Sequence, residues 1–206
     1  MESSDSPRRG RPRSFDPTEV LDRAMRVFWR KGYESTSLSD LTAATGVNRP
    51  SLYTAFGNKE SLFRHVLDHY MQGPSGYFPE ALAAPTAREV VERLLRGAVN
   101  LATDARSPTG CLWVRGALSY GDGPPRMRRE MYARRRAGER ALSDRLEEAR
   151  ASGDLPPDAD PEALARFYQT AHFGIQVQAA CGARRADLEK VVEEALRALP
   201  APVSEA

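Results

Sequence analysis

A short polar segment over residues 49–54, which includes Arg49, Tyr53 and Thr54, carries side chains that can recognise nucleic acid. A guanidinium can donate two hydrogen bonds to O6 and N7 of guanine, and a small apolar group can contact the methyl group of thymine. Tyrosine and lysine side chains suit phosphate oxygens, and Lys59 follows shortly afterwards. These residue types predict a nucleic-acid contact, in which Arg49 reads a base and Tyr53 and Lys59 hold the backbone.

Two short helices must position these side chains. Ser37 is expected to cap a helix over residues 38–45, and Asn48 a helix over residues 49–56. Gly46 supplies the turn between them. Two short helices joined by a tight turn are typical of a helix-turn-helix, in which the second helix enters the major groove by its N-terminal end.

Residues 13–68, and especially the segment GVNRPSLYTAFGNKESLF at 46–63, resemble the DNA-binding domain of the tetracycline-repressor (TetR) family of bacterial regulators. The residues that carry the match are Gly46, Val47, Leu52, Tyr53, Phe56, Lys59 and Leu62. The resemblance covers about a quarter of the chain. It implies a DNA-binding transcription regulator with a C-terminal helical domain for dimerisation and ligand binding, usually a repressor that a small molecule releases from its operator.

The resemblance also assigns roles by position. Phosphate contacts fall on Thr36, Ser37, Tyr53 and Lys59, and base contacts on Ser39, Arg49, Pro50, Ser51 and Thr54. The family often has Tyr-x-His-Phe where this chain has Ala55 before Phe56, so the contact of that histidine is not expected here. Residues 1–14 form an expected flexible basic arm, and its Arg11 and Arg13 could reach an adjacent minor groove.

The whole sequence predicts an all-α fold of about nine helices. The expected organisation is the basic arm, a helix-turn-helix domain over 15–57, a connecting helix over 58–72, and a ligand-binding and dimerisation domain over 73–206. The glycine- and proline-rich residues 73–79 predict a break. The remaining expected helices cover residues 17–31, about 87–105, 111–120, 126–151, 161–181 and 185–199.

The last two helices carry apolar residues on more than one side. A helix of this kind must bury both sides, and a second copy of the chain is the simplest partner for the outer one. The alternative is that both sides pack inside one protomer. The expected homodimer interface comprises Phe173, Val177, Ala180, Leu188, Val192 and Leu196.

An aromatic set with a few polar groups predicts a pocket for a small-molecule effector of unknown identity. Its candidate lining is Cys111, Leu112, Trp113, Tyr120, Phe167, Tyr168, His172 and Gln176, each of which can also be ordinary core. Cys111 stands at an expected helix start, where the helix dipole would favour a thiolate. The competing function is therefore a ligand-binding or redox- or electrophile-sensing protein that responds through Cys111.

Other classes of protein find little support. No stretch approaches the roughly 18 apolar residues that span a bilayer, so we expect a cytoplasmic protein without membrane contact. No nucleophile elbow, phosphate loop or dinucleotide fingerprint indicates an enzyme, and no cofactor is expected. His65 and His69 have the spacing of a metal pair but no third ligand, so no metal is expected. The arginine-rich run from Arg126 to Arg150 is interleaved with acidic residues and predicts a solvated helix face.

Overall fold

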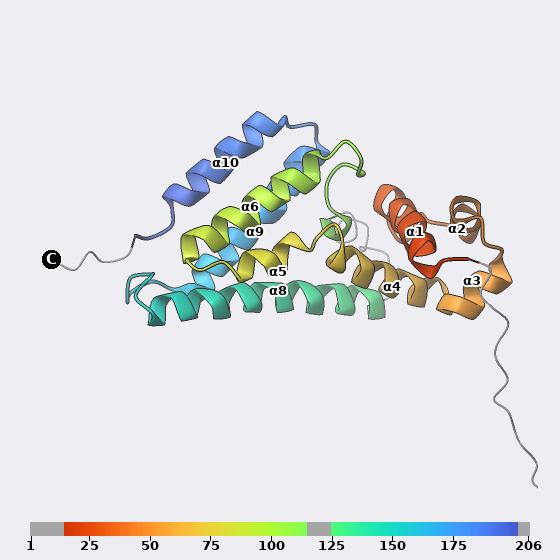
Figure 1. The fold of residues 1–206 in the computed structure, drawn as a ribbon, viewed down its shortest axis with the longest axis horizontal. Coiled ribbons are helices and arrows are strands. Elements are labelled where there is room, and N and C mark those ends of the chain that lie inside the picture. The colour runs from red at the N-terminus through yellow and green to blue at the C-terminus, as the bar shows by residue number, and fades with distance from the viewer. Residues whose placement is uncertain (1–14, 115–124, 202–206) are drawn as a thin grey trace, which may run out of the picture.

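The computed structural model describes residues 15–114 and 125–201. Within these ranges the chain forms helices and connecting turns without any strand. The helices whose bounds lie within the described residues are α1 (Pro17–Lys31), α2 (Leu38–Thr45), α3 (Arg49–Phe56), α4 (Lys59–Gln72), α5 (Tyr77–Leu82), α6 (Ala87–Thr103), α8 (Pro125–Ala151), α9 (Pro161–Ala180) and α10 (Arg185–Arg197). Figure 1 shows an elongated molecule, with α1–α3 at one end and α6, α8, α9 and α10 forming the other.

Short polar side chains begin most of these helices, as the sequence predicts. Asp16 accepts a hydrogen bond from the backbone N–H of Thr18 at the start of α1. Asn48 caps α3 and Asn58 caps α4 in the same way, each by accepting from a backbone N–H three residues on. Such caps satisfy N–H groups that have no partner inside the helix, so they fix where each helix starts.

One helix was not predicted. Residues 73–79 were expected to form a break, yet α5 begins at Tyr77 within them. Gly76 precedes it without a side-chain cap, and Pro79 lies in the first turn, where its missing N–H costs no helical hydrogen bond. Ala81 is buried against the C-terminal core, so tertiary packing stabilises a segment whose local signals are poor.

The short helix expected over residues 111–120 can be followed only in part. Residues 112–114 are helical, and the rest of it, including Tyr120, lies outside the described residues. Arg11 and Arg13 of the expected basic arm also lie outside them.

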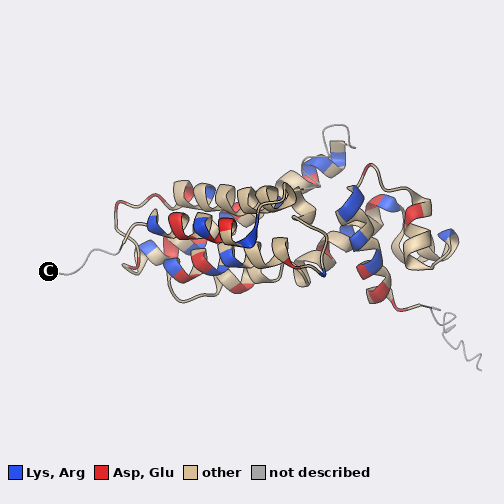
Figure 2. Ribbon diagram, turned by 90° about the horizontal axis from the view of Figure 1, so that it is seen from above, with Lys and Arg blue, Asp and Glu red and all other residues tan. Residues whose placement is uncertain are grey.

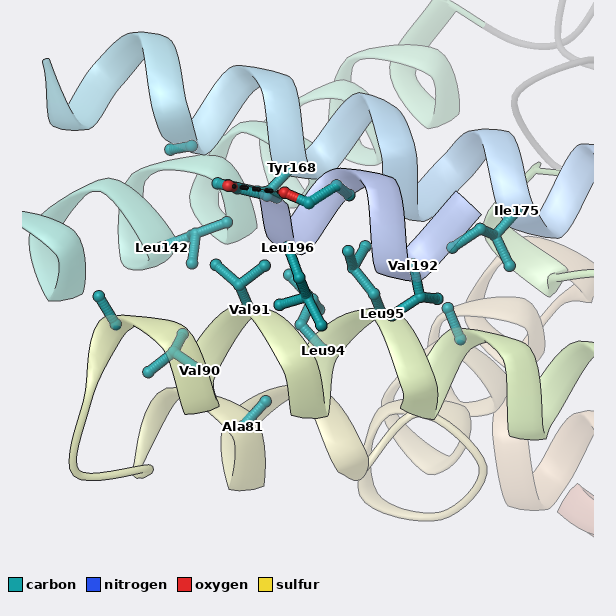
Figure 3. Close-up of a cluster of buried hydrophobic side chains, with 14 of the residues drawn as sticks. Ala81, Val90, Val91, Leu94, Leu95, Leu142, Tyr168, Ile175, Val192 and Leu196 are labelled. Atoms are coloured by element: carbon teal, nitrogen blue, oxygen red, sulfur yellow. Dashed lines mark hydrogen bonds between the residues drawn. The ribbon is translucent and has the colours of Figure 1, made fainter. Parts of the chain in front are cut away.

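The C-terminal core is formed by α6, α8, α9 and α10, with α5 against one side. Figure 3 shows Val91, Leu94 and Leu95 of α6 pointing toward Val192 and Leu196 of α10. Tyr168 of α9 lies in the same cluster, where its hydroxyl donates to the carbonyl oxygen of Ala195 at 3.1 Å. Burying this many apolar side chains, at about 25 cal/mol per Å², makes the cluster the main source of stability in this half.

The core of the N-terminal helices continues beyond α4. Trp29 of α1 and Tyr70 of α4 are fully buried and meet edge to face, with ring centroids 5.0 Å apart. Residues from the later part of the chain belong to the same cluster: Leu101, Cys111, Leu112, Val114, Met127 and Met131. One apolar core therefore bridges the expected boundary between the N-terminal and C-terminal domains.

Ion pairs reinforce this junction. Arg64 of α4 contacts Glu130 of α8 at 2.6 Å, and Asp68 of α4 contacts Arg134 of α8 at 2.5 Å. Figure 2 shows basic and acidic residues interleaved along the C-terminal helices. Part of the arginine-rich run thus joins α8 to α4. Within the described residues, no helix combines the length and apolar character that crossing a bilayer requires.

Candidate DNA-binding site

The two short helices α2 and α3 are held from behind by their apolar residues. Leu41 of α2 and Leu52 and Phe56 of α3 are buried in the core shared with α1 and α4. Gly46 closes α2 in the left-handed region, at φ 72°, which a residue with a Cβ adopts only under strain. The turn therefore directs the chain into α3 at a fixed angle.

The side chains at the start of α3 face solvent. Arg49, Pro50 and Thr54 are exposed, while Ser51 and Tyr53 are half-buried. The hydroxyl of Thr54 donates to the carbonyl oxygen of Pro50 at 2.8 Å, which suits an outward methyl group. All five of these predicted contact residues are thus at least partly accessible on the second short helix.

Arg49 is oriented by its neighbour one turn later. The centre of its guanidinium lies 5.3 Å from the ring centroid of Tyr53. A cation over an aromatic face is attracted by the ring quadrupole, and stacking leaves the guanidinium edges free to donate hydrogen bonds. Tyr53 thus restricts the side chain that we expect to read a base.

Ser37 and Ser39 line the start of α2. Ser37 caps the helix by accepting from the backbone N–H of Asp40, and Asp40 accepts from the backbone N–H of Ser37 in return. The two serine hydroxyls lie 2.9 Å apart, and both residues are exposed. Hydrogen bonds from Lys31 and Ser37 lower the pKa of Asp40, so its carboxylate keeps the capping box closed.

Thr36 corrects one prediction. It was expected to contact phosphate, but its side chain is buried and its hydroxyl donates to the carbonyl oxygen of Gly32 at 2.6 Å. The hydroxyl helps to close the turn after α1 instead. Its neighbour Ser37 remains exposed at the candidate site.

Lys59 is more constrained than a solvated lysine. Its ammonium lies 4.5 Å from the ring centroid of Tyr33 and donates to the carbonyl oxygen of Glu34 at 3.4 Å. Partial burial lowers the pKa of Lys59. It is the first residue of α4, where free backbone N–H groups also favour an anion. The charge is therefore held in place beside a helix N-terminus.

The predicted effector residues do not form one group. Phe167 is 46% exposed, Tyr168 is buried beside α10, and Trp113 packs partly buried against the N-terminal core. Cys111 and Leu112 are buried in that N-terminal core. His172 and Gln176 are buried on α9, where both contact the hydroxyl of Tyr77. Tyr77 was absent from the predicted effector residues because helix α5, on which it lies, was not predicted.

Cys111 is a buried thiol. Its sulfur lies 3.3 Å from the hydroxyl oxygen of Tyr70, and burial raises the pKa of Cys111. A helix dipole at this position would favour the thiolate that the competing function requires, but desolvation disfavours the charged form more strongly. The structure therefore gives no support to a reactive Cys111.

The predicted interface residues fall into two sets. Val177 and Ala180 are exposed on α9, and Phe173 is half-buried. The three on α10 are a correction, because Leu188, Val192 and Leu196 are buried in the core of their own protomer. Helix α10 turns that apolar side toward α6 and α9, so these residues have no surface left for a second chain.

The two histidines on α4 have separate partners. His69 lies 2.6 Å from a carboxylate oxygen of Asp22, and His65 lies 2.8 Å from the carbonyl oxygen of Ser61. Across residues 15–114 and 125–201, no group of three or more His, Cys, Asp or Glu is placed to hold a metal ion.

The all-helical fold and the exposed first turn of α3 define a DNA-binding regulator of the helix-turn-helix class. The chain belongs to the tetR family of bacterial regulatory proteins. Residues 20–66 match the family model for that N-terminal domain, and residues 87–199 match the model described as the tetracyclin repressor-like C-terminal domain. The protein is therefore a TetR-family transcriptional regulator.

Individual relatives are similar to this chain over most of its length. The HTH-type transcriptional repressor ComR of Escherichia coli strain K12 is 33% identical over 194 residues, which cover 93% of this chain and 92% of ComR. A cysteine mutant of the TetR-family regulator CifR, complexed with 26-bp double-strand operator DNA, is 46% identical with a TM-score of 0.85. That match covers 92% of this chain and 100% of the CifR chain.

The stacking of Arg49 on Tyr53 leads to a first prediction. Tyr53→Ala is expected to weaken discrimination at the base that Arg49 reads by about two- to fivefold, since an exposed cation–π contact contributes about 0.5–1 kcal/mol. Tyr53→Phe keeps the ring and should keep the base preference, losing only the contacts of the hydroxyl. Titrations of duplexes with single base-pair changes measure both effects. Equal loss of discrimination in the two variants would show that the ring does not orient Arg49.

Proposed function

We propose that the protein is a homodimeric repressor that binds a palindromic operator and leaves it when a small molecule binds the C-terminal domain. The observation that carries this proposal is the exposed first turn of α3, where Arg49 is stacked on Tyr53 above a buried anchor of Leu52 and Phe56. Because the target of such a protein is chromosomal DNA, we place it in the cytoplasm.

The relatives support this function at the level of the family. ComR is a transcriptional repressor, and CifR forms a complex with double-strand operator DNA. The alternative, a helical protein that only senses ligands or electrophiles, would leave the exposed face of α3 without a role. The buried thiol of Cys111 adds nothing in favour of that alternative.

An uncharged stripe on α9 supports the homodimer. Its exposed positions recur at the spacing of a helix–helix seam: Ala163, Phe167, Thr170, Gly174, Val177 and, at the C-cap, Cys181. Phe167 is 46% exposed and Val177 is 37% exposed, and on the neighbouring helix α10 Val191 is 43% exposed. A second copy of the chain could cover these exposed apolar side chains through an isologous interface.

A dimer also suits the proposed DNA. Two α3 helices about 34–36 Å apart can enter successive major grooves on one side of a palindromic duplex. The N-terminal helices are connected to the C-terminal helices by one apolar core, which is shared by α1, α4, residues 111–114 and the start of α8. We infer that an effector shifts α4 through this core and thereby changes the spacing of the two α3 helices.

A salt titration tests DNA recognition. The operator is first obtained by sequencing the duplexes that the purified protein retains from a random pool. Affinity should then fall linearly with salt on logarithmic axes, because lysine and arginine contacts release counterions from the phosphates. Arg49→Ala is expected to lose about 1–3 kcal/mol, roughly 5- to 150-fold, and to relax preference at one base pair.

Lys59→Ala is the matched comparison, because it removes a charge at the other edge of the same site. We expect it to weaken binding about equally for all sequences and to reduce the salt slope by about 1. A sequence-selective loss in Lys59→Ala, or a salt-insensitive affinity in the unmodified protein, would contradict this assignment of roles.

A further inference from the structure

A buried polar cluster joins α5 to α9. The hydroxyl of Tyr77 on α5 lies 2.7 Å from Nε2 of His172, and the side-chain amide of Gln176 donates to the same hydroxyl oxygen at 3.4 Å. His172 and Gln176 are one turn apart on α9, and both are buried. Three polar side chains thus meet inside the C-terminal domain, and two of them, His172 and Gln176, belong to the effector pocket predicted from the sequence.

Two atoms of this cluster have no hydrogen-bond partner: Nδ1 of His172 and Oε1 of Gln176. Since Gln176 donates to the oxygen of Tyr77, the Tyr77 hydroxyl is free to donate its proton to Nε2 of His172. The ring proton of a neutral histidine then lies on Nδ1. The cluster therefore presents one unpaired donor and one unpaired acceptor, on side chains one helical turn apart.

Aromatic rings lie around one of these two side chains, the imidazole of His172. The rings of Tyr77, Phe78 and Phe173 lie around the imidazole of His172, with centroids 6.0, 6.3 and 5.1 Å from it. Burial lowers the pKa of His172 to about 4, so the imidazole is neutral at physiological pH. A ligand that met these side chains would lie against aromatic walls and exchange hydrogen bonds at one edge.

Unpaired polar atoms are costly in a folded core, because folding removes the water that satisfied them. A polar group without a partner in the protein points to a partner from outside it. A single trapped water is one such partner, and a ligand that carries both an acceptor and a donor is the other.

We propose that Nδ1 of His172 and Oε1 of Gln176 are the hydrogen-bonding contacts of the effector, and that the effector is a small neutral molecule with an apolar body and a primary carboxamide or an equivalent adjacent acceptor–donor pair. The inference rests on the proposed function, because that function requires an effector and the inference assigns the chemistry of this effector. The carbonyl oxygen accepts from Nδ1–H of His172, and the amide N–H donates to Oε1 of Gln176. A charged ligand is disfavoured because the cluster offers a neutral imidazole and a neutral amide as contacts.

The position of the cluster links it to the N-terminal helices. Tyr77 begins α5, which follows α4 after a short turn, and Tyr70 near the end of α4 contacts Cys111 in the shared core. A ligand wedged beside Tyr77 would displace α5 and with it the end of α4. Such a displacement would couple the cluster to the helix that leads to the DNA-binding end.

The test uses the full-length protein without DNA and labelled with ¹⁵N-histidine. Acetamide, benzamide and cyclohexanecarboxamide are the probes, with acetophenone as an acceptor-only control and benzoate as a charged control. We expect at least one carboxamide to bind about tenfold or more tightly than both controls and to shift the Nδ1 resonance of His172. Gln176→Leu should abolish this preference, whereas Gln178→Leu, on the exposed side of α9, should retain it.

Other outcomes overturn the proposal. If no carboxamide shifts the His172 resonances of the unmodified protein, or if the Nδ1 proton stays bonded to a water that no carboxamide displaces, the partner is solvent. If Gln176→Leu melts like the unmodified protein and still prefers carboxamides, the acceptor lies elsewhere. Operator affinity is measured separately, so a failure to bind DNA would refute the proposed function without touching this result.

Discussion

Val177→Glu is expected to convert the proposed dimer into monomers and to weaken operator binding by about 10²–10⁴-fold. Val177 is 37% exposed in the uncharged stripe of α9, between Gly174 and Cys181. Two glutamates brought together across an isologous interface would be desolvated and would repel each other. The affinity loss follows because linked binding of two half-sites raises apparent affinity by about 10²–10⁴-fold over a single one.

Sedimentation and operator titration of the same sample measure this result. Tyr132→Glu is the matched control, because Tyr132 is a large residue 56% exposed on α8, outside the stripe. It should leave both the assembly state and the affinity unchanged. If Val177→Glu still sediments as a dimer and binds the operator normally, the interface lies on another surface.

Gly97→Ala is expected to lower the free energy of unfolding by about 1–3 kcal/mol, although alanine is the better helix former. A Cβ at Gly97 of α6 would lie 2.2 Å from Cδ2 of Tyr77, far inside van der Waals contact. The Tyr77 ring cannot easily move aside, because its hydroxyl is held by His172 and Gln176. Overpacking a well-filled site forces side chains and backbone to shift.

Urea denaturation at a fixed protein concentration measures the loss, since unfolding of the proposed dimer would depend on protein concentration. Gly138→Ala on α8 is the control, because its nearest neighbours lie at 3.6 and 3.7 Å, which is ordinary contact. Tyr77→Ala should cost less in the Gly97→Ala background than alone, with a coupling of about 0.5–3 kcal/mol. If Gly97→Ala instead stabilises the protein as much as Gly138→Ala, then Tyr77 does not rest on α6.

Local signals were sufficient for most of the fold. Asp16, Asn48 and Asn58 cap their helices because a side-chain oxygen next to free N–H groups works within a few residues of sequence. Gly46 ends α2 for an equally local reason. Helix α5 escaped prediction because it depends on a distant feature, the absence of a side chain at Gly97 where Tyr77 packs.

The candidate site was predictable where exposure follows from helix periodicity. Arg49 and Thr54 face outward because Leu52 and Phe56 must face inward on a two-turn helix. Thr36 was assigned wrongly because a hydroxyl suits both a phosphate and a backbone carbonyl, and only the fold shows that Gly32 is within reach.

The incorrect prediction of interface residues on α10 shows a different limit of sequence analysis. Periodicity reveals that a helix has two apolar sides, but it does not say which side meets its own core. Leu188, Val192 and Leu196 face α6 and α9 in the same protomer, and Val191 is left on the outside. The residue buried in the core of the chain, Val192, and the exposed residue, Val191, are adjacent in the sequence, so periodicity alone does not tell them apart.

The apolar core shared by α1, α4, residues 111–114 and the start of α8 also limits how this protein can be divided into stable fragments. A fragment that stopped after α4 would keep every residue of the helix-turn-helix, yet it would lose Cys111, Leu112, Met127 and Met131 from the cluster around Trp29 and Tyr70. Apolar surface that is dry in the whole chain would then face water. The helix-turn-helix is thus not expected to be stable when it is separated from the rest of the chain. Transferring its DNA specificity to another regulator would require the core residues that support it as well.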